Sequence, residues 1–425
     1  MLESLNLKRF SDIPLPKFVK VKQLFKQDRI DDVVQEVRAQ LIPHLTHLQG
    51  KTIAIGVGSR GIANIKVITK TLVNELITAG AKPFIIPTMG SHGGATALGQ
   101  AGVLATYGIT PDSMGVPVDA SLEVVSIGEL EPGLPIYVAQ SALQAEGIIV
   151  IARVKAHTAF RGPIESGVAK MITIGLGKQI GADSLHHQGF GRFAELIPKA
   201  AQMIVEKSKV LFALGIVENA YEQTYKIEVI SRPEILAMDK ERALLEESKK
   251  IMGQLLFPEF DVLVIEEIGK NISGDGQDPN VTGLYINKYC SGGPRFQKSV
   301  IFGLTEETHG NANGMGVVDV VARNLFDDID FGSTYTNSFT STEILPVKIP
   351  MVAGSKEDAL RIVVKTCNGV ERGKHRIVWI KNTLELEEIV ISEALLEEAQ
   401  AHSQIEVLTQ PGELTFNQGE PIFPW

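Results

Sequence analysis

Residues 147–190 contain a group of side chains that could act as nucleophiles, acid/base catalysts or metal ligands. They are His157, Lys170, His186 and His187. The run from Ile148 to Ala152 is continuously apolar and rich in β-branched residues, which favours a buried strand of a parallel sheet. Ligands of open α/β sheets bind beyond the carboxyl ends of the strands, and His157 follows this strand closely. The pattern therefore predicts a reactive strand–helix–loop segment at one edge of a sheet.

Lys170 is predicted to lie on a helix that begins near Pro163, because proline is favoured in the first helical turn. The residues just before the lysine are small and would leave room for a flat ligand: Ser166, Gly167 and Ala169. Three apolar residues after it indicate a half-buried helix: Met171, Ile172 and Ile174. In such surroundings a lysine tends to lose its charge and becomes nucleophilic. The alternative is that the lysine extends to water and the histidine pair is ordinary polar surface.

Two other segments, both closer to the N-terminus, are predicted turns that follow apolar, strand-like runs. The first, GSRGIANI, contains Ser59 and Arg60. Backbone amides at a helix start attract anions, and a guanidinium suits carboxylate or phosphate. The second, residues 87–96, places His92 among glycines that allow the backbone to approach a ligand closely. Because consecutive parallel strands end at one edge, we expect Arg60, His92 and His157 to face a common crevice.

The order of His157, Lys170 and a histidine sixteen residues after the lysine resembles the nickel-pincer lactate racemase family of 2-hydroxyacid racemases and epimerases. The resemblance implies that Lys170 carries a pyridinium-3,5-bisthiocarboxylic acid mononucleotide through a thioamide bond. It also implies that His186, or alternatively His187, ligates the nickel. His92 and His157 would then be the catalytic acid/base pair.

The same resemblance implies binding roles for three more residues. Ser59 and Arg60 would bind the cofactor, and Arg60 would also hold the substrate carboxylate together with Lys288. The family's Asp-x-x-Arg-Pro element is replaced here by VGSRG, with Val57 at the acid position and Gly61 at the proline position. The interval between His157 and Lys170 is also wider than in lactate racemase. We therefore expect a substrate larger or more polar than lactate, such as a sugar acid or a dicarboxylate.

The chain from Lys51 onward alternates strand-like and helix-like segments, which predicts βαβ units and a parallel sheet. A new α/β pattern starts near residue 258. We therefore expect an N-terminal cofactor and catalytic domain over residues 1–257 and a smaller α/β domain over residues 258–425, with a cleft between them. The last twenty or so residues are expected to fold back on the first domain, and FVKVKQLF near the N-terminus is expected to be an edge strand.

Composition narrows the class of protein. The formal net charge of −9 argues against nucleic acid as a partner. No apolar run is long enough for a bilayer, and the N-terminus lacks the pattern of a signal peptide, so a cytoplasmic protein is expected. The two cysteines cannot ligate an iron–sulfur cluster within one chain and are expected to be free thiols. The expected partners are a hydroxy-acid substrate and the enzymes that build the cofactor, and the chain could form a homo-oligomer.

Two other functions use the same residues. His92, His157 and His186 could surround a zinc ion in a hydrolase or lyase, although no acidic residue completes a familiar ligand spacing. A small-anion binding protein could use the same crevice without any reactive lysine.

Overall fold

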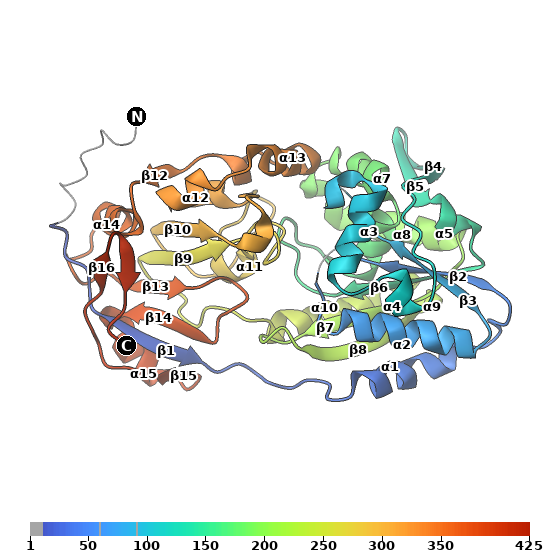
Figure 1. The fold of residues 1–425 in the computed structure, drawn as a ribbon, viewed down its shortest axis with the longest axis horizontal. Coiled ribbons are helices and arrows are strands. Elements are labelled where there is room, and N and C mark those ends of the chain that lie inside the picture. The colour runs from blue at the N-terminus through green and yellow to red at the C-terminus, as the bar shows by residue number, and fades with distance from the viewer. Residues whose placement is uncertain (1–11, 59–60, 91) are drawn as a thin grey trace. The chain divides into compact units, whose positions relative to one another are not determined.

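The computed structural model describes residues 12–58, 61–90 and 92–425. The chain divides into two compact units. The N-terminal unit comprises residues 27–252 with residues 340–342, and the C-terminal unit comprises residues 253–339 and 343–425 together with the described residues up to Lys26. Figure 1 shows parallel strands flanked by helices in each of them.

The N-terminal unit is built on a five-stranded sheet with the order β3-β2-β6-β7-β8. The first four of these strands are parallel, and β8 runs antiparallel to β7. The strands are β2 (Thr52–Val57), β3 (Lys82–Pro87), β6 (Gly147–Arg153), β7 (Val210–Glu218) and β8 (Thr224–Ser231). Because β6 lies inside the sheet, six of its seven residues are buried, as its continuous apolar sequence predicts.

Helices cover this sheet. Those before the reactive segment are α1 (Val33–Leu41), α2 (Ile65–Thr78), α3 (Ala97–Thr106), α4 (Pro111–Met114) and α5 (Gln140–Gln144). Those within and after it are α6 (Val168–Lys170), α7 (Lys178–His186), α8 (Phe193–Lys207), α9 (Arg232–Ala237) and α10 (Asp239–Ile251). A separate hairpin is formed by β4 (Val124–Glu131) and β5 (Leu134–Ala139). Single turns lie at η3 (Ile42–His44), η4 (His92–Ala95), η5 (Met171–Gly175) and η6 (Phe190–Arg192).

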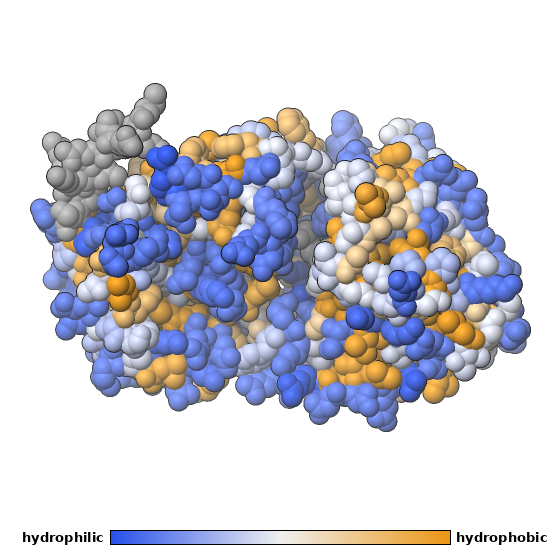
Figure 2. All heavy atoms as spheres, viewed as in Figure 1, coloured by the Kyte–Doolittle hydropathy of each residue, from blue (hydrophilic) through white to orange (hydrophobic). Residues whose placement is uncertain are grey.

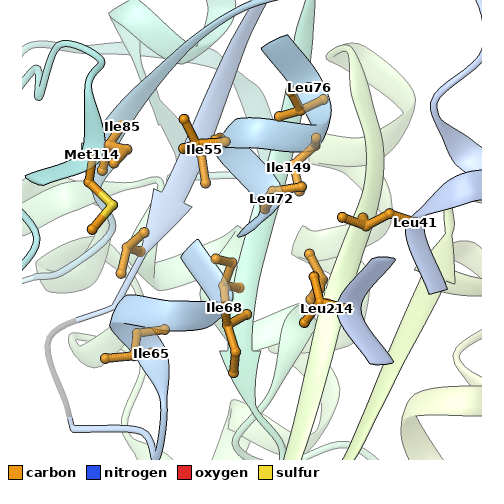
Figure 3. Packing of buried hydrophobic residues seen from close by; sticks show 14 of the residues in the cluster. Leu41, Ile55, Ile65, Ile68, Leu72, Leu76, Ile85, Met114, Ile149 and Leu214 are labelled. Carbon is orange, nitrogen blue, oxygen red and sulfur yellow. The ribbon is translucent and has the colours of Figure 1, made fainter. Parts of the chain in front are cut away.

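The core of the N-terminal unit forms where α1 and α2 pack on the sheet. Ile68 and Leu72 of α2 meet Ile55 and Ile149 of the central strands, and Leu41 of α1 joins the same cluster (Figure 3). All five side chains are fully buried. This packing fixes the strands whose carboxyl ends carry the candidate residues.

The C-terminal unit contains an eight-stranded sheet with the order β12-β11-β10-β9-β13-β14-β1-β15. Its strands are β1 (Phe18–Gln23), β9 (Val262–Ile268), β10 (Lys298–Leu304), β11 (Val320–Ala322), β12 (Met351–Ala353), β13 (Ile377–Ile380), β14 (Glu388–Ser392) and β15 (Ile405–Val407). Its helices are α11 (Pro279–Thr282), α12 (Arg323–Asp327), α13 (Phe331–Ser341), α14 (Lys356–Thr366) and α15 (Leu396–Ala401). A terminal hairpin joins β16 (Thr415–Asn417) to β17 (Glu420–Ile422), and short turns form η7 (Glu306–Thr308), η8 (Met315–Val317), η9 (Leu345–Val347) and η10 (Glu393–Leu395).

The two ends of the chain correct the expected domain limits. Strand β1 pairs with β14 and with β15, so it belongs to the C-terminal unit and is not an edge strand. The last residues, which were expected to fold back on the first domain, belong to the C-terminal unit. Phe423 instead packs 5.0 Å from Trp379 and 6.1 Å from Phe18, measured between ring centroids. Both corrections have one cause, because these segments bury their apolar side chains in the core of the C-terminal unit.

Hydrophilic residues occupy much of the face seen in Figure 2, with apolar residues between them in smaller areas. Among the described residues, no helix is long and apolar enough to cross a membrane.

Candidate active site

The two ends of the loop after β6 are hydrogen-bonded to each other. Lys155 and Ser166 form two backbone hydrogen bonds with each other, of 3.1 and 3.2 Å, so the chain between them forms a closed loop. His157 lies in this loop and is only 8% exposed. Its backbone N–H donates to Glu165 at 2.7 Å, and Arg161 donates to its carbonyl at 2.6 Å. The loop therefore holds His157 by its backbone and leaves its ring to other contacts.

The ring of His157 contacts Lys170 directly. The backbone N–H of Ala159 donates to Nδ1 at 2.9 Å, so in a neutral ring the proton is on Nε2. That nitrogen lies 2.8 Å from Lys170 Nζ. An Nε2–H group can only donate, so Nζ must offer a lone pair. In this tautomer, a hydrogen bond between the two atoms requires Nζ to be unprotonated, which is the nucleophilic form of an amine.

The helix that carries Lys170 starts later than the sequence predicts. It begins at Val168, not near Pro163, and it passes directly into the π-helical turn η5. Ser166 lies outside the helix because its backbone is paired with Lys155, and Gly167 immediately precedes the first turn. The small residues therefore do not form a helical surface beside the lysine. The expected half-buried environment is present, since Lys170 is of intermediate exposure and Ile172 is fully buried.

A residue that sequence reasoning missed supports this turn from behind. Glu241 of α10 is 2% exposed, and both of its oxygens accept the backbone N–H of Ala169 at 3.1 Å. Burial raises the pKa of Glu241 to about 7, against the opposing effect of the backbone hydrogen bonds from Ala169 and Val168. Gly167 is required here, because a Cβ at this position would overlap Glu241 Oε1. No spacing in the sequence links residues so far apart.

The adjacent histidines differ in their surroundings. His186 ends α7, and its Nδ1–H donates to the carbonyl of Ala182 at 2.7 Å, which leaves the lone pair on Nε2. Burial lowers the pKa of His186, and a charge on Lys170 would lower it further, so the ring is neutral near pH 7. A neutral ring with one nitrogen fixed by a carbonyl is the form that binds metals. His187, in contrast, is exposed.

Three phenylalanines join the two ring systems. Phe190 lies 6.1 Å from His157 and 5.5 Å from His186 between ring centroids. Phe193 lies 5.2 Å from His186, and Phe160 lies 4.4 Å from His157. The structure therefore brings His157, Lys170 and His186 together around an aromatic wall. The apolar character of these phenylalanines is visible in the sequence, but their spacing does not predict that they pack together.

His92 follows β3, and its place in the sheet agrees with the expected common edge. Strands β3, β2 and β6 are neighbours and run parallel, so β3 and β6 end at the same edge. His92 opens η4, in which Gly93 and Gly94 take φ values of 65° and 63° that favour glycine. Ser59 and Arg60 lie outside the described residues.

A buried lysine, also missed from the sequence, ties this edge to α7. Lys178 is 1% exposed and donates from Nζ to the carbonyl of Pro87 at 2.5 Å. Burial lowers its pKa to about 8. It therefore links the end of β3, which leads to His92, with the start of the helix that ends at His186.

The other expected residues can be placed as well. Lys288 lies in the C-terminal unit on an exposed segment, with Nζ 5.7 Å from the centroid of the Tyr289 ring. Among the described residues, which include His92, His157 and His186, no three His, Cys, Asp or Glu side chains are grouped to hold a metal ion. The three-histidine zinc site of the alternative hydrolase or lyase is therefore not formed.

Comparisons with known proteins identify the fold. No family model and no curated protein matches the sequence. Among solved structures, the chain is similar to the lactate racemase apoprotein from Thermoanaerobacterium thermosaccharolyticum. The TM-score is 0.50 at 15% sequence identity, over 87% of this chain and 99% of the other. The likeness is to a distant structural neighbour, and it shows an α/β fold with parallel sheets of the lactate racemase type.

Proposed function

We propose that the protein is an isomerase that inverts the configuration of a 2-hydroxy acid, with a nickel-pincer nucleotide attached to Lys170. The observation that carries the proposal is the 2.8 Å contact between Lys170 Nζ and the protonated nitrogen of His157. It would supply an amine for covalent attachment and a histidine beside the attached group. The fold shared with a lactate racemase supports the same class of reaction.

The residues present fit such a group. Lys170 would hold it through a thioamide, since its amine is half-buried and lies 2.8 Å from His157 Nε2. His186 would ligate the nickel through Nε2, because Nδ1 is already committed to the Ala182 carbonyl. When bound, the cofactor supplies a reversible acceptor for the hydride on the substrate's C2. The aromatic wall of Phe160, Phe190 and Phe193 would keep water from these groups.

His157 would move the hydroxyl proton of the substrate. Its backbone is fixed by Glu165 and Arg161, so the ring stays oriented while its protonation changes. We assign the same role for the opposite stereoisomer to His92, which follows a strand ending at the same edge. Arg60 and Lys288 would bind the substrate carboxylate, and Ser59 with Arg60 would bind the cofactor.

The substrate is expected to be larger or more polar than lactate. Val57 is fully buried in the core, so no carboxylate is available at that position to orient Arg60. A Cβ at Gly61 would come no closer than 3.9 Å to the ring of Tyr107, so the glycine leaves open space. Sugar acids and dicarboxylates are the classes that would use this room and a second interaction with an arginine.

The test is to produce the protein together with cofactor-building enzymes and to measure its intact mass and nickel content. A single adduct on the peptide containing Lys170, with bound nickel, is expected. The loaded protein should epimerise or racemise a sugar acid or dicarboxylate faster than lactate. An unmodified Lys170 under these conditions would refute the proposed function, while a strong preference for lactate would refute only the substrate class.

A further inference from the structure

Helix α10 presents two charged side chains to the reactive segment. Glu241 and Lys249 are eight residues apart, which places them on one side of a helix about two turns from each other. In the sequence this helix has the pattern of a charged surface helix. In the structure, Leu244, Leu245 and Ile251 are buried, so the helix is fixed against the unit that it covers.

Glu241 acts on the chain immediately before Lys170. The first amides of a helix have no carbonyl partner within the helix, and here Glu241 accepts from Ala169 and Val168. Its carboxyl group therefore acts on the lysine through the backbone that it holds.

Lys249 acts in the same way on His157, through Glu165. Its Nζ lies 3.0 Å from Glu165 Oε1, and the other oxygen of this fully buried carboxylate accepts the N–H of His157 at 2.7 Å. Burial alone would lower the pKa of Lys249, but its ion pairs with Glu165 and Glu246 raise it. The lysine is therefore a charged partner that stabilises the buried Glu165.

We infer that α10 sets the distance between His157 and Lys170, with Glu241 as the positioning residue of the lysine and Lys249 that of the histidine. Helix α10 therefore holds both residues of the 2.8 Å pair between Lys170 and His157. Loss of either the Glu241 or the Lys249 interaction should separate the two residues. The inference rests on the proposed function only in taking the Lys170 amine as the reacting group.

The experiment measures the amine itself in the folded protein without cofactor. A limiting amount of an acylating reagent at pH 7.5 modifies each lysine at a rate set by its neutral fraction and access. Peptide mass spectrometry gives the rate at Lys170 relative to exposed Lys250. In the unmodified sequence we expect Lys170 to react about tenfold faster, because an Nζ that accepts a hydrogen bond from His157 Nε2–H must be unprotonated.

Glu241→Ala should reduce the Lys170 rate about tenfold, since the freed lysine regains its proton in water. Glu241→Gln should retain most of the rate, because its amide oxygen still accepts an N–H. Lys249→Met should reduce it about threefold, as expected for loss of a partly exposed ion pair. The matched controls on the same helix are Glu247→Gln and Lys250→Met. In Lys250→Met the Lys170 rate is compared with that of another exposed lysine, because Lys250 is the usual reference. Should Glu241→Ala fail to fold, Glu241→Asp withdraws the carboxylate by one methylene and carries the same expectation.

A merely structural role would lower the unfolding temperature without changing the relative rate in the folded molecules. An unchanged Lys170 rate in folded Glu241→Ala and Lys249→Met would therefore overturn the inference. If Lys170 in the unmodified sequence reacts no faster than Lys250, the neutral amine and with it the proposed function lose their support. The two failures are thus distinguishable.

Discussion

The two units use the carboxyl edge of a parallel sheet in different ways. Beyond β6 in the N-terminal unit, His157 and Lys170 are held by their backbones, and their side chains meet each other. Beyond β9 in the C-terminal unit, polar side chains hold the loops together. Lys270 donates to the carbonyl of Gly274 at 2.6 Å, and Asn313 donates to the same carbonyl at 3.1 Å. The same architecture thus places a histidine–lysine contact beyond the edge in one unit and hydrogen bonds within the loops in the other.

The histidines show the same difference. In each of His157 and His402, Nδ1 accepts the backbone N–H of the residue two positions later. The remaining nitrogen of His157 meets a lysine amine, and its ring is buried, while His402 is half-exposed. The local turn contact is therefore shared, and burial beside Lys170 distinguishes His157 from His402.

The largest difference in activity is expected between substitutions of the two lysines, Lys170 beyond β6 and Lys270 beyond β9. Lys170→Ala should abolish isomerisation and the cofactor's near-ultraviolet absorption in protein made with the cofactor-building enzymes, because the attachment point is lost. Alanine suits a helix, so circular dichroism should be unchanged. Lys270→Ala is the matched control and should lose about 1 kcal/mol of stability from its hydrogen bond to the Gly274 carbonyl. Full activity of Lys170→Ala would remove the distinction between the edges.

The second effect should appear at the histidines. His157→Gln in cofactor-loaded enzyme should lower kcat by about 10²- to 10⁴-fold, the usual contribution of a general acid/base. His402→Gln should leave kcat within about twofold, since its ring accepts a hydrogen bond within its own local turn and belongs to the C-terminal unit, whereas Lys170 belongs to the N-terminal unit. Measurement of kcat in both directions of the isomerisation would show whether one direction depends more on His157. Equal effects of the two substitutions would contradict the contrast.

A smaller effect concerns stability and pH at Glu241. Its pKa is raised from 4.5 to about 7 in the folded protein, so the folded state binds more protons than the unfolded state between these values. The stabilising contribution of this protonated group is complete below pH 4.5 and is lost as the pH rises through about 7. Compared with Glu241→Gln, the natural protein should therefore lose about 3 kcal/mol between pH 4.5 and 8.

Urea unfolding at several pH values would measure this difference. Glu266 of the C-terminal unit is the comparison. Burial raises its pKa too, but Trp379 donates to it at 3.0 Å and opposes the shift. Glu266→Gln should show the same direction with a smaller change. A stability difference between Glu241→Gln and the natural protein that does not depend on pH would show that Glu241 is ionised throughout.

The smallest effect should come from the terminal aromatic cluster. Phe423→Ala removes a half-buried ring from Phe18 and Trp379 and should destabilise the C-terminal unit by about 1–2 kcal/mol. The acylation rate of Lys170 should not change, because the reactive segment is held within the N-terminal unit. Thermal unfolding and the acylation assay would be made on the same sample. A changed Lys170 rate would show that the two units are coupled.

Much of the fold was predictable, because parallel strands buried on both faces are continuous apolar runs that can be recognised locally. Strands β2, β3 and β6 and the order of His157, Lys170 and His186 follow from such runs and from spacing. The start of the Lys170 helix was wrong because backbone pairing between Lys155 and Ser166 extends the loop past Pro163. Such pairing depends on the closed loop and leaves no periodic pattern.

By itself, the sequence determined which segments are strands and which reactive residues follow them. Tertiary structure alone decided that His157 Nε2 meets Lys170 Nζ, that His186 and not His187 is enclosed, and that Glu241 holds the turn before the lysine. It also placed β1 between β14 and β15. The physical reason is common to all four. Protonation, burial and strand pairing depend on groups brought together by packing, and those groups are too far apart in the chain to form a pattern.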